Sequence, residues 1–388
     1  MKSLLMVTTV PDTLSAFLIP FAHHFRTQGW RVDAMATGVS QNVECIKAFD
    51  QVWDIEWSRN PLNPLNLVVA PRIIQQVIRQ EKYDLVHVHT PVAAFVTRYA
   101  LKDLNKQNRL RVIYTAHGFH FYNGGELLKN AIFLTLEKLA GRWTDYLVVI
   151  NREDEETAKR YRLIPHEKIR YMPGIGVDLQ YYNPQAVSDA EVEQLRQELG
   201  LAPDTPFFLS VAEFIPRKHP QDVLRAFAQL ARPQACLAFA GDGFLMNQIQ
   251  NLAMQLGVQN QVRFLGVRRD IPALMRAATA TILASDREGL PRCVMESMSM
   301  ETPVIGTDIR GTRDLLKEGC GLLVKVGDIE AITQGMAWIL DNPQAAQAIA
   351  KQGRERIASY ELSYILKEYE ALYAEAILEI RTAEQKNL

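Results

Sequence analysis

The sequence predicts an α/β protein built from two doubly wound parallel sheets in separate domains. Three observations lead to this fold class. The chain has 388 residues, which is more than one ordinary core holds. Short apolar runs alternate with segments of helical spacing along almost its whole length. This alternation is broken once, by a turn-rich stretch from Pro173 to Pro184. We therefore expect domains over residues 1–183 and 184–364, followed by a helical C-terminal segment over residues 365–388.

The first half opens with an apolar run over residues 4–8. We interpret this run as a strand, because Pro11 and Asp12 interrupt it before a signal peptide could form. Helical spacing follows up to Gly29, and the same alternation continues from there. The further expected strands are 31–36, 84–89, 111–115 and 146–150, and the further expected helices are 65–80, 127–142 and 151–162.

The second half repeats this alternation. The expected strands are 207–212, 235–240, 262–266, 280–284 and 303–306, with helices over 219–231, after Gly243, near 271–277 and over 293–298, and a helical C-terminal stretch over 342–385. In such sheets ligands bind beyond the carboxyl ends of the strands. The loops at those ends, and the cleft expected between the two domains, are therefore the places to look for a site.

Composition excludes several classes of protein. The net charge of −1 gives no support for a nucleic-acid partner. The four cysteines lack Cys-x-x-C spacing, which fits a reducing cytoplasm and argues against a disulfide framework or a zinc site. No uncharged apolar run approaches the roughly 18 residues that a membrane span needs. We expect a cytoplasmic protein that does not cross a membrane but can lie at its inner face.

The most informative stretch runs from Ser285 to Glu296 and predicts a strand-loop-helix corner. Pro291 suits the first position of a helix, and the N–H groups around residues 290–293 would then form an anion site. Glu288 precedes that site, and Glu296 lies about a turn and a half inside the helix. One carboxylate can therefore face a sugar and the other a ribose. The alternative is that both are ordinary solvated carboxylates.

Three other strand ends of the second half carry candidates. Arg217 and Lys218 are adjacent cations that could clamp a diphosphate, or could form a solvated basic turn. Gly241, Asp242 and Gly243 either serve a tight turn or let the backbone approach a ligand. The third candidate is the stretch Gly266, Val267 and Arg268.

The first half offers imidazoles and hydroxyls at its strand ends. His87 and His89 alternate with valines and share one face of a strand, where we expect core histidines. His117 precedes Gly118 at the end of the next strand, where an imidazole can hydrogen-bond a sugar hydroxyl. Thr8 and Thr9 end the first strand. The sequence has no Asp-x-Asp pair to hold a divalent metal against a nucleotide diphosphate, so positive side chains must neutralise it.

Together these residues resemble the GT-B glycosyltransferases of family 4, and most closely those of capsular polysaccharide and exopolysaccharide assembly. The resemblance spans the whole chain. It rests on Glu288 and Glu296 as the family's Glu-x7-Glu, on the stretch from Tyr114 to Phe121, and on further motifs in the family's order. These motifs are Gly174 to Asp178, Gly241 to Gly243, Phe264 to Gly266 and Pro303 to Ile305.

The resemblance implies two Rossmann-like domains, an acceptor-side first domain and a nucleotide-sugar second domain. It also implies that the terminal helix, over residues 365–388, crosses back and packs on the first domain. It implies a retaining, metal-independent transferase without a cofactor. The donor would be a nucleotide sugar such as a UDP-linked hexose or N-acetylhexosamine, and the acceptor a glycan or lipid-linked hydroxyl. Arg217 and Lys218 would neutralise the diphosphate, and Glu296 would hold the ribose. Glu288, Gly289 and Leu290 would hold the sugar together with His117, and residues 266–268 would flank the base.

The sequence departs from the family pattern in two places. Glu213 stands where many members have an arginine, which shifts the phosphate clamp onto Arg217. Thr8 and Thr9 stand where many members have glycines, so that loop can serve the acceptor. Rival interpretations are an epimerase or phosphorylase of the same fold, or a two-domain binding protein. The aromatic segment 53–67 and the loop from Phe119 to Phe121 could contact a membrane, although such residues are more often core.

Overall fold

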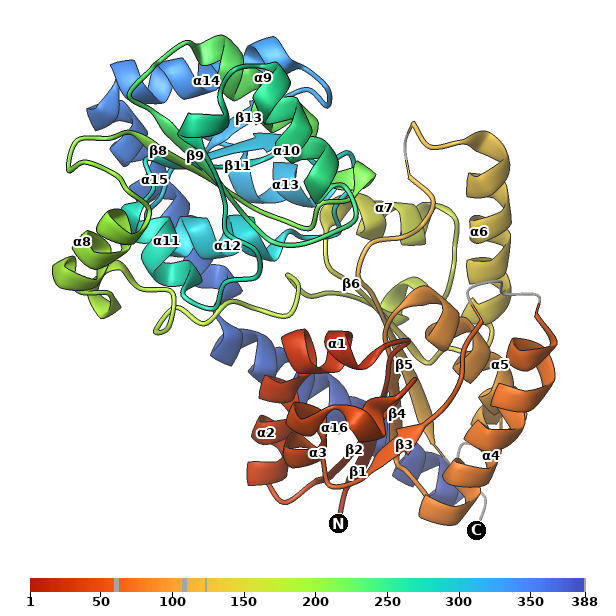
Figure 1. The fold of residues 1–388 in the computed structure, drawn as a ribbon. Helices are drawn as coiled ribbons and strands as arrows, with labels where there is room; N and C mark the ends of the chain where they lie inside the picture. Colours follow the sequence, from red (N-terminus) through yellow and green to blue (C-terminus); the bar gives the residue numbers. More distant parts are fainter. Residues whose placement is uncertain (59–62, 107–109, 123, 387–388) are drawn as a thin grey trace. The chain divides into compact units, whose positions relative to one another are not determined.

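The computed structural model describes residues 1–58, 63–106, 110–122 and 124–386 and divides the chain into two compact units (Figure 1). The first unit contains Met1–Ile175 and Ser363–Leu388, and the second contains Gly176–Leu362. Each is built around one parallel sheet with helices packed on it.

The first unit has a seven-stranded sheet in the order β3-β2-β1-β4-β5-β6-β7. Its strands are β1 (Ser3–Val7), β2 (Arg31–Ala36), β3 (Val52–Asp54), β4 (Leu85–Val88), β5 (Arg111–Ala116), β6 (Tyr146–Val149) and β7 (Ile169–Tyr171). Its main helices are α1 (Pro11–Thr13), η1 (Leu14–Leu18), α2 (Ile19–Thr27), α3 (Val43–Ala48), η3 (Leu65–Val69), α4 (Ala70–Glu81), α5 (Pro91–Lys106), α6 (Leu127–Gly141), α7 (Arg152–Arg160) and α16 (Leu362–Lys386). Short 3-10 turns are η2 (Val39–Gln41) and η4 (His166–Lys168).

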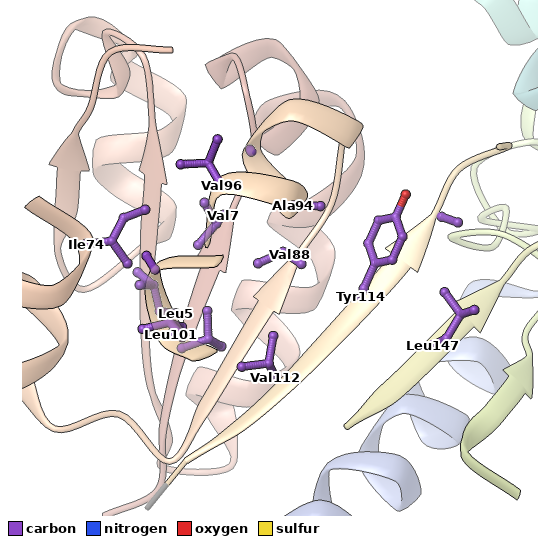
Figure 2. Close-up of a cluster of buried hydrophobic side chains, with 14 of the residues drawn as sticks. Leu5, Val7, Ile74, Val88, Ala94, Val96, Leu101, Val112, Tyr114 and Leu147 are labelled. Carbon is purple, nitrogen blue, oxygen red and sulfur yellow. The ribbon is translucent and has the colours of Figure 1, made fainter. Parts of the chain in front are cut away.

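The central strands of this sheet are mostly apolar, and they are buried along their whole length. Every residue of β1, β4 and β5 is buried, because helices cover both faces of a parallel sheet. Figure 2 shows side chains of these strands, among them Val7, Val88 and Val112, interlocking with Ile74 of α4 and Leu101 of α5. The apolar runs recognised in the sequence are therefore the core of the unit.

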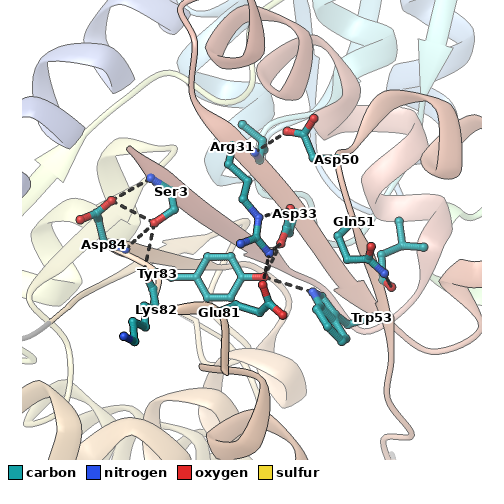
Figure 3. Close-up of polar contacts among 12 residues, drawn as sticks. Ser3, Arg31, Asp33, Asp50, Gln51, Trp53, Glu81, Lys82, Tyr83 and Asp84 are labelled. Atoms are coloured by element: carbon teal, nitrogen blue, oxygen red, sulfur yellow. Dashed lines mark hydrogen bonds and ion pairs between the residues drawn. The ribbon is translucent and has the colours of Figure 1, made fainter. Parts of the chain in front are cut away.

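A buried polar cluster joins the beginnings of β1, β2 and β4 (Figure 3). Asp33 is completely buried and accepts hydrogen bonds from Arg31 at 2.5 Å and from the hydroxyl of Tyr83. Burial and this carboxylate raise the pKa of Tyr83 well above its usual range. Asp84 accepts a bond from the N–H of Ser3 at 2.8 Å. Because the cluster lies toward the amino ends of the strands, we assign it to stability rather than to ligand binding.

The second unit has a six-stranded parallel sheet in the order β10-β9-β8-β11-β12-β13. Its strands are β8 (Phe207–Val211), β9 (Cys236–Ala240), β10 (Val262–Phe264), β11 (Ala280–Leu283), β12 (Val304–Thr307) and β13 (Leu322–Val324). Its main helices are α8 (Asp189–Glu198), α9 (Pro220–Leu230), α10 (Met246–Gln255), α11 (Ile271–Ala277), α12 (Arg292–Ser299), α13 (Arg310–Leu316), α14 (Ile329–Asp341) and α15 (Pro343–Ile357). Single 3-10 turns are η5 (Pro184–Ala186), η6 (Pro216–Lys218), η7 (Gln259–Gln261) and η8 (Ala358–Tyr360).

The boundary between the units lies between Ile175 and Gly176 rather than after residue 183. The reason is a short backbone bridge. The N–H of Val177 donates to the carbonyl of Tyr360 at 2.9 Å, and the N–H of Leu362 donates to the carbonyl of Val177 at 3.0 Å. The turn-rich stretch after residue 176 is thereby tied into the second unit. From Ser363 onward α16 belongs to the first unit, and its Tyr369 and Tyr373 are buried there.

Candidate functional site

The second sheet reverses its strand order between β8 and β11, which are hydrogen-bonded neighbours. Loops that leave the carboxyl ends of such a strand pair diverge and leave room for a ligand. The turn η6 follows β8, and the corner from Ser285 to Glu296 follows β11. Their backbones are joined by the N–H of Asp286, which donates to the carbonyl of Arg217 at 3.0 Å. The two stretches singled out in the sequence therefore meet at this edge.

Arg217 and Lys218 surround the carboxylate of Glu288. Lys218 Nζ donates to Glu288 Oε1 at 2.6 Å, and Arg217 Nη1 lies 3.6 Å from Glu288 Oε2. The side chains of Glu288 and Lys218 are only 9% and 14% exposed, so this is a partly desolvated ion pair and not a solvated turn. Arg217 also donates to the carbonyl of Arg287 at 3.1 Å, which fixes the loop beside its own guanidinium.

Arg310 and Gly311 complete this corner, and the sequence analysis did not identify them. Arg310 is buried, and its Nε donates to the carbonyl of Glu288 at 3.1 Å. A Cβ at Gly311 would lie 2.0 Å from the carbonyl oxygen of Gly289, so only glycine allows α13 to approach the loop this closely. The segment Ile309-Arg310-Gly311 follows β12, the next strand in the sheet. Its position directly after a buried strand was the one feature of the sequence that could have marked it as part of the site.

Helix α12 begins one residue later than expected. Pro291 is its N-cap with an extended ψ of 117°, and Arg292 is the first helical residue. The carbonyl of Pro291 accepts the first helical bonds, from Val294 at 3.2 Å and Met295 at 3.3 Å. The prediction that Pro291 occupies the first helical position is therefore wrong by one residue, but the helix still starts beside Glu288 and Gly289.

Glu296 is buried inside α12 and is held by a residue one turn earlier. Arg292 Nε donates to Glu296 Oε1 at 2.7 Å. Tyr182, from the turn-rich stretch, is also buried close to this carboxylate. Burial first, and then the charge of Glu296, raises the pKa of Tyr182 well above its usual range. The alternative of a helix-surface carboxylate is therefore wrong, and Arg292 and Tyr182 are neighbours that the sequence analysis missed.

The glycines at 241 and 243 are required by a contact within the protein. A Cβ at Gly241 would lie 2.0 Å from the carbonyl oxygen of Ala212, and one at Gly243 would lie 2.6 Å from that of Phe214. The backbone of Asp242 also pairs with the loop after β8, since the N–H of Phe214 donates to its carbonyl at 2.8 Å. The tight turn alone therefore explains why glycines occupy these two positions, without a ligand approaching the backbone. Ligand contacts at residues 241–243 stay a prediction.

Gly266, Val267 and Arg268 leave β10 at the far side of the same edge. Val267 is 77% exposed, and a Cβ at Gly266 would enter open space. Arg268 is committed to two carboxylates, Asp270 Oδ2 at 2.6 Å and Glu198 Oε1 at 2.7 Å. Contact between this loop and the base of the nucleotide stays a prediction. Such a contact would be made by the backbone and by Val267 rather than by the charged group of Arg268.

The corresponding edge of the first sheet is built from neutral groups. Its strand order reverses between β1 and β4, where the hydroxyls of Thr9 and Thr90 lie 2.8 Å apart. Thr90 has a φ of 44°, a left-handed conformation that a β-branched residue rarely adopts. His89 Nδ1 lies 3.0 Å from His117 Nε2. The strand ends therefore bring Thr9 and His89 to one edge, and His89 connects it to His117 after β5.

His87 continues this chain of hydrogen bonds into the core. Its Nε2 lies 2.7 Å from Thr115 Oγ1, and its Nδ1 lies 2.5 Å from the hydroxyl of Tyr373 in α16. Burial lowers the pKa of His87 to about 3 and that of His117 to about 4, so both imidazoles are neutral at pH 7. The expectation of core histidines is confirmed for the burial of His87 and His89. His89 Nε2, however, has no hydrogen-bond partner among the described residues.

The loop that carries His117 is anchored by a carboxylate from the next helix. Gly118 has a φ of 107°, a backbone conformation that favours glycine. The following N–H, of Phe119, donates to Asp154 Oδ2 at 3.2 Å. Asp154 is itself buried and accepts a bond from the side chain of Asn151 at 2.8 Å. Asp154, at the start of α7, thus fixes the direction in which the His117 loop leaves the strand.

Comparison with known proteins identifies the family. A model described as "Glycosyltransferase Family 4" matches residues 16–181, and one described as "Glycosyl transferases group 1" matches residues 191–356. "Putative glycosyltransferase EpsD" of Bacillus subtilis is 32% identical over 99% of both chains. The chain belongs to the family 4 glycosyltransferases. A second glycosyltransferase, from Escherichia coli, is named "UDP-Gal:alpha-D-GlcNAc-diphosphoundecaprenol alpha-1,3-galactosyltransferase" and is 27% identical over 74% of this chain and 73% of its own.

Solved structures agree on the fold. Anabaena HepE, solved in complex with UDP and glucose, superposes with a TM-score of 0.80 at 20% identity, covering 97% of this chain and all of HepE. The expected GT-B architecture, with two Rossmann-like sheets, is confirmed.

In the two segments considered for membrane contact, the large aromatic side chains are buried or pack against the core. Phe119 and Phe121 are buried and stack with ring centroids 4.8 Å apart. Trp53 and Trp57 pack against the core of the first unit. Residues 59–62 of the second segment lie outside the described residues. Of the helices in the described ranges, none is both long enough and apolar enough to span a bilayer.

Proposed function

We propose that this glycosyltransferase moves a hexosyl or N-acetylhexosaminyl group from a UDP sugar to a hydroxyl of a glycan or lipid-linked acceptor, with retention of configuration and without a metal. The observation that carries the proposal is the meeting of Arg217, Lys218 and Glu288 at the strand-order reversal of the second sheet. The name of the Escherichia coli relative and the UDP bound to HepE favour a uridine donor.

The charges of this edge suit a leaving diphosphate. Four cations, Arg217, Lys218, Arg292 and Arg310, lie with two buried carboxylates, Glu288 and Glu296. Breaking the bond between the anomeric carbon and the phosphate oxygen concentrates negative charge on that oxygen. Cations fixed in advance by the protein stabilise this charge in the transition state more than in the bound donor. In this proposal Arg217 and Lys218 act on the diphosphate, and no metal is needed.

Buried hydroxyls at the same edge add to this argument. Ser285 at the end of β11 and Thr312 in the first turn of α13 are fully buried, and their hydroxyls have no hydrogen-bond partner among the described residues. Buried polar atoms are normally paired by protein groups or by water. Two unpaired hydroxyls beside four cations fit an edge that is completed by a polar ligand.

The way the carboxylates are held argues against a covalent route to the proposed retention. A double displacement would require one carboxylate to attack the anomeric carbon as a nucleophile. Glu288 is ion-paired with Lys218, and Glu296 with Arg292, so both have positioning partners already. We therefore favour attack by the acceptor on the face that the diphosphate leaves, with Glu288 holding the sugar and Glu296 the ribose.

The proposed compartment is the cytoplasm. All four cysteines are free, and Cys45, Cys236 and Cys320 are buried thiols. Burial raises the pKa of the Cys45 thiol to about 11, which keeps it protonated and unreactive. Unpaired cysteines in a chain of this size fit a reducing compartment.

The decisive experiment measures nucleotide release from a panel of nucleotide sugars. The full chain is incubated with UDP-, GDP- and ADP-hexoses and UDP-N-acetylhexosamines, with and without lipid-linked acceptors, and with or without EDTA. We expect UDP release that needs the acceptor and is unchanged by EDTA. An α-configured product bond from an α-configured donor, measured by NMR coupling constants, would support retention. The absence of nucleotide diphosphate with every donor, or a β-configured product, would overturn the proposal.

A further inference from the structure

His89 is a buried imidazole that uses one of its two ring nitrogens. Its Nδ1 lies 3.0 Å from His117 Nε2, and the two rings stack with centroids 5.3 Å apart. Its Nε2 is buried and has no hydrogen-bond partner among the described residues. Leaving a buried polar atom unpaired destabilises a fold, so an apolar side chain would be the more stable choice here unless the contact with His117 has a use.

The backbone and the neighbouring ring hold His89 in place. Its N–H donates to the carbonyl of Val7 at 2.9 Å, which extends the pairing of β4 with β1 by one residue. The next residue is Thr90, with its left-handed φ of 44°, and its hydroxyl accepts a bond from the N–H of Thr9 at 2.9 Å. The ring of His87 lies 4.1 Å from that of His89, between centroids. A strained backbone held by several bonds is typical of functional sites, and it gives the ring little freedom to turn.

His117 keeps its other nitrogen for a ligand. Its side chain is partly exposed, and its Nδ1 has no hydrogen-bond partner within the described part of the chain. The bond from the N–H of Phe119 to Asp154 fixes the backbone of this loop but not the side-chain torsions of His117. Within the described residues, the contact with His89 is therefore the one hydrogen bond that restrains the imidazole of His117.

Both rings are neutral at pH 7, so each carries a single proton on nitrogen. Burial lowers the pKa of His89 well below its usual range and that of His117 to about 4. Either His89 donates its Nδ1–H, or His117 donates its Nε2–H. In the second arrangement the proton of His89 would be on Nε2, as a buried N–H without an acceptor. Buried N–H groups without a partner are rarer in proteins than buried acceptors without one, which favours the first arrangement.

We propose that His89 is a positioning residue for His117. It donates its Nδ1–H to His117 Nε2, which fixes the orientation of the His117 ring and keeps the proton of His117 on Nδ1. That N–H then bonds a hydroxyl oxygen of the donor sugar. The inference rests on the proposed function, in which His117 contacts the sugar, and it adds which atom makes the contact and which residue prepares it. A donor that is oriented before binding loses less entropy when the substrate arrives.

The first test compares two substitutions of His89 in the full chain. His89→Leu removes the bond to His117 and should lower kcat/KM for the nucleotide sugar about fivefold, the usual contribution of one neutral hydrogen bond. His89→Asn should restore kcat/KM to within about twofold of wild type, because an amide N–H can take the place of Nδ1–H. A His89→Leu enzyme that equals the wild type, or a His89→Asn enzyme no better than His89→Leu, would overturn the proposal.

A double substitution separates positioning from general damage to the first unit. If His89 acts only through His117, adding His89→Leu to His117→Ala should change kcat/KM by less than about twofold. A further fivefold loss would mean that His89 acts by another route, and the proposal would fail. Tyr83→Phe is the matched control, because it breaks a buried bond to Asp33 at the amino ends of the same sheet. It should lower the unfolding temperature and leave kcat/KM unchanged. A loss in this control equal to that of His89→Leu would assign both effects to stability, against the proposal.

Nitrogen NMR locates the proton of His117 without any substrate. In the full chain with isotope-labelled histidine, correlations between ring nitrogens and ring hydrogens distinguish protonated from bare nitrogens, and His89→Asn and His117→Ala assign the signals. We expect His117 to be protonated on Nδ1 in the wild type and to become a mixture of both tautomers in His89→Leu. A proton on Nε2 of His117 in the wild type would overturn the inference. Failure of every donor in the nucleotide-release assay would contradict the proposed reaction instead, and the NMR result would still decide the role of His89.

Discussion

The equivalent edges of the two sheets carry different kinds of polar group. In the second unit, the loops at the strand-order reversal bring together arginine, lysine and glutamate side chains, among them Lys218 and Glu288. In the first unit, the corresponding loops bring together hydroxyls and imidazoles, among them Thr90 and His117. The two edges share the same strand-order reversal, but the side chains that gather there differ in chemistry. Fixed charges suit a phosphate, whereas neutral donors and acceptors suit sugar hydroxyls.

Polar groups at both edges are buried, but burial has a different consequence in each unit. The carboxylates of the second unit are only slightly exposed, and each has a cation at hydrogen-bond distance, which offsets the cost of burying a charged group. The imidazoles of the first unit are buried with hydroxyls and with one another, and there burial favours the neutral form. The first edge therefore avoids fixed charge at pH 7, while the second depends on it.

The substitution Lys218→Met is expected to have the largest effect on catalysis, because it disrupts the charged edge of the second unit. This change removes the ammonium and keeps most of the side-chain volume. If Lys218 stabilises the leaving diphosphate, kcat should fall about 100- to 1000-fold, as for loss of one donor to a developing negative charge. The measurement is steady-state UDP release with the preferred donor and acceptor.

The control for Lys218 is Arg232→Met, which removes a 52% exposed cation paired with Asp341 elsewhere in the second unit. It should leave kcat unchanged. A Lys218→Met enzyme that turns over within threefold of wild type would show that the charged edge is a structural ion pair and not a phosphate site.

His117→Ala should have a smaller and different effect. A neutral imidazole that hydrogen-bonds a donor hydroxyl contributes about 1 to 2 kcal/mol, or about 5- to 30-fold in kcat/KM. Because the change leaves the second unit untouched, affinity for UDP alone, measured by calorimetry, should not change. His23→Ala, an exposed histidine in the same unit, is the control. Weaker binding of UDP by His117→Ala would mean that the division between sugar and phosphate edges is wrong.

Acid should destabilise the first unit before the second. Burial lowers the pKa of His87 to about 3, below the value of about 6.5 in an unfolded chain. Between these values the unfolded chain binds a proton that the folded unit excludes, so stability is complete above pH 6.5 and falls as pH decreases. His87 alone should lower the free energy of unfolding by about 2 kcal/mol between pH 6.5 and 5.

Hydrogen exchange, corrected for the intrinsic pH dependence of the rate, can locate this loss. Protection in β4 and β5 should decrease between pH 6.5 and 5 more than protection in β8 and β9, whose core contains no histidine cluster among the described residues. Equal losses in both sheets would indicate that the imidazoles do not control the acid stability of the first unit.

Apolar periodicity was enough to predict the buried strands and most helices, because it reports directly on which faces are covered. It failed for three-residue edge strands such as β3 and β7, which are too short to show a period, and for α8, where only Leu195 is buried. Glu288, Arg217 and Lys218 could be assigned to one site because each follows a buried strand. Arg310 could not be linked to them, since its bond to the carbonyl of Glu288 depends on how closely α13 approaches the loop at Gly311.

Tyr373→Phe should give the smallest effect and tests whether α16 supports the neutral edge. The Tyr373 hydroxyl lies 2.5 Å from His87 Nδ1, and both side chains are buried. Removing it leaves a buried ring nitrogen unpaired, which should lower the free energy of unfolding by about 1 kcal/mol in urea titration. Tyr181→Phe is the matched control, because its hydroxyl bonds the carbonyl of Arg269 at 3.2 Å from a side chain that is 53% exposed. Equal stability of the two variants would mean that α16 holds the first sheet by apolar packing alone, and that the hydrogen-bond chain from Tyr373 to His87 adds nothing to the edge that carries His117.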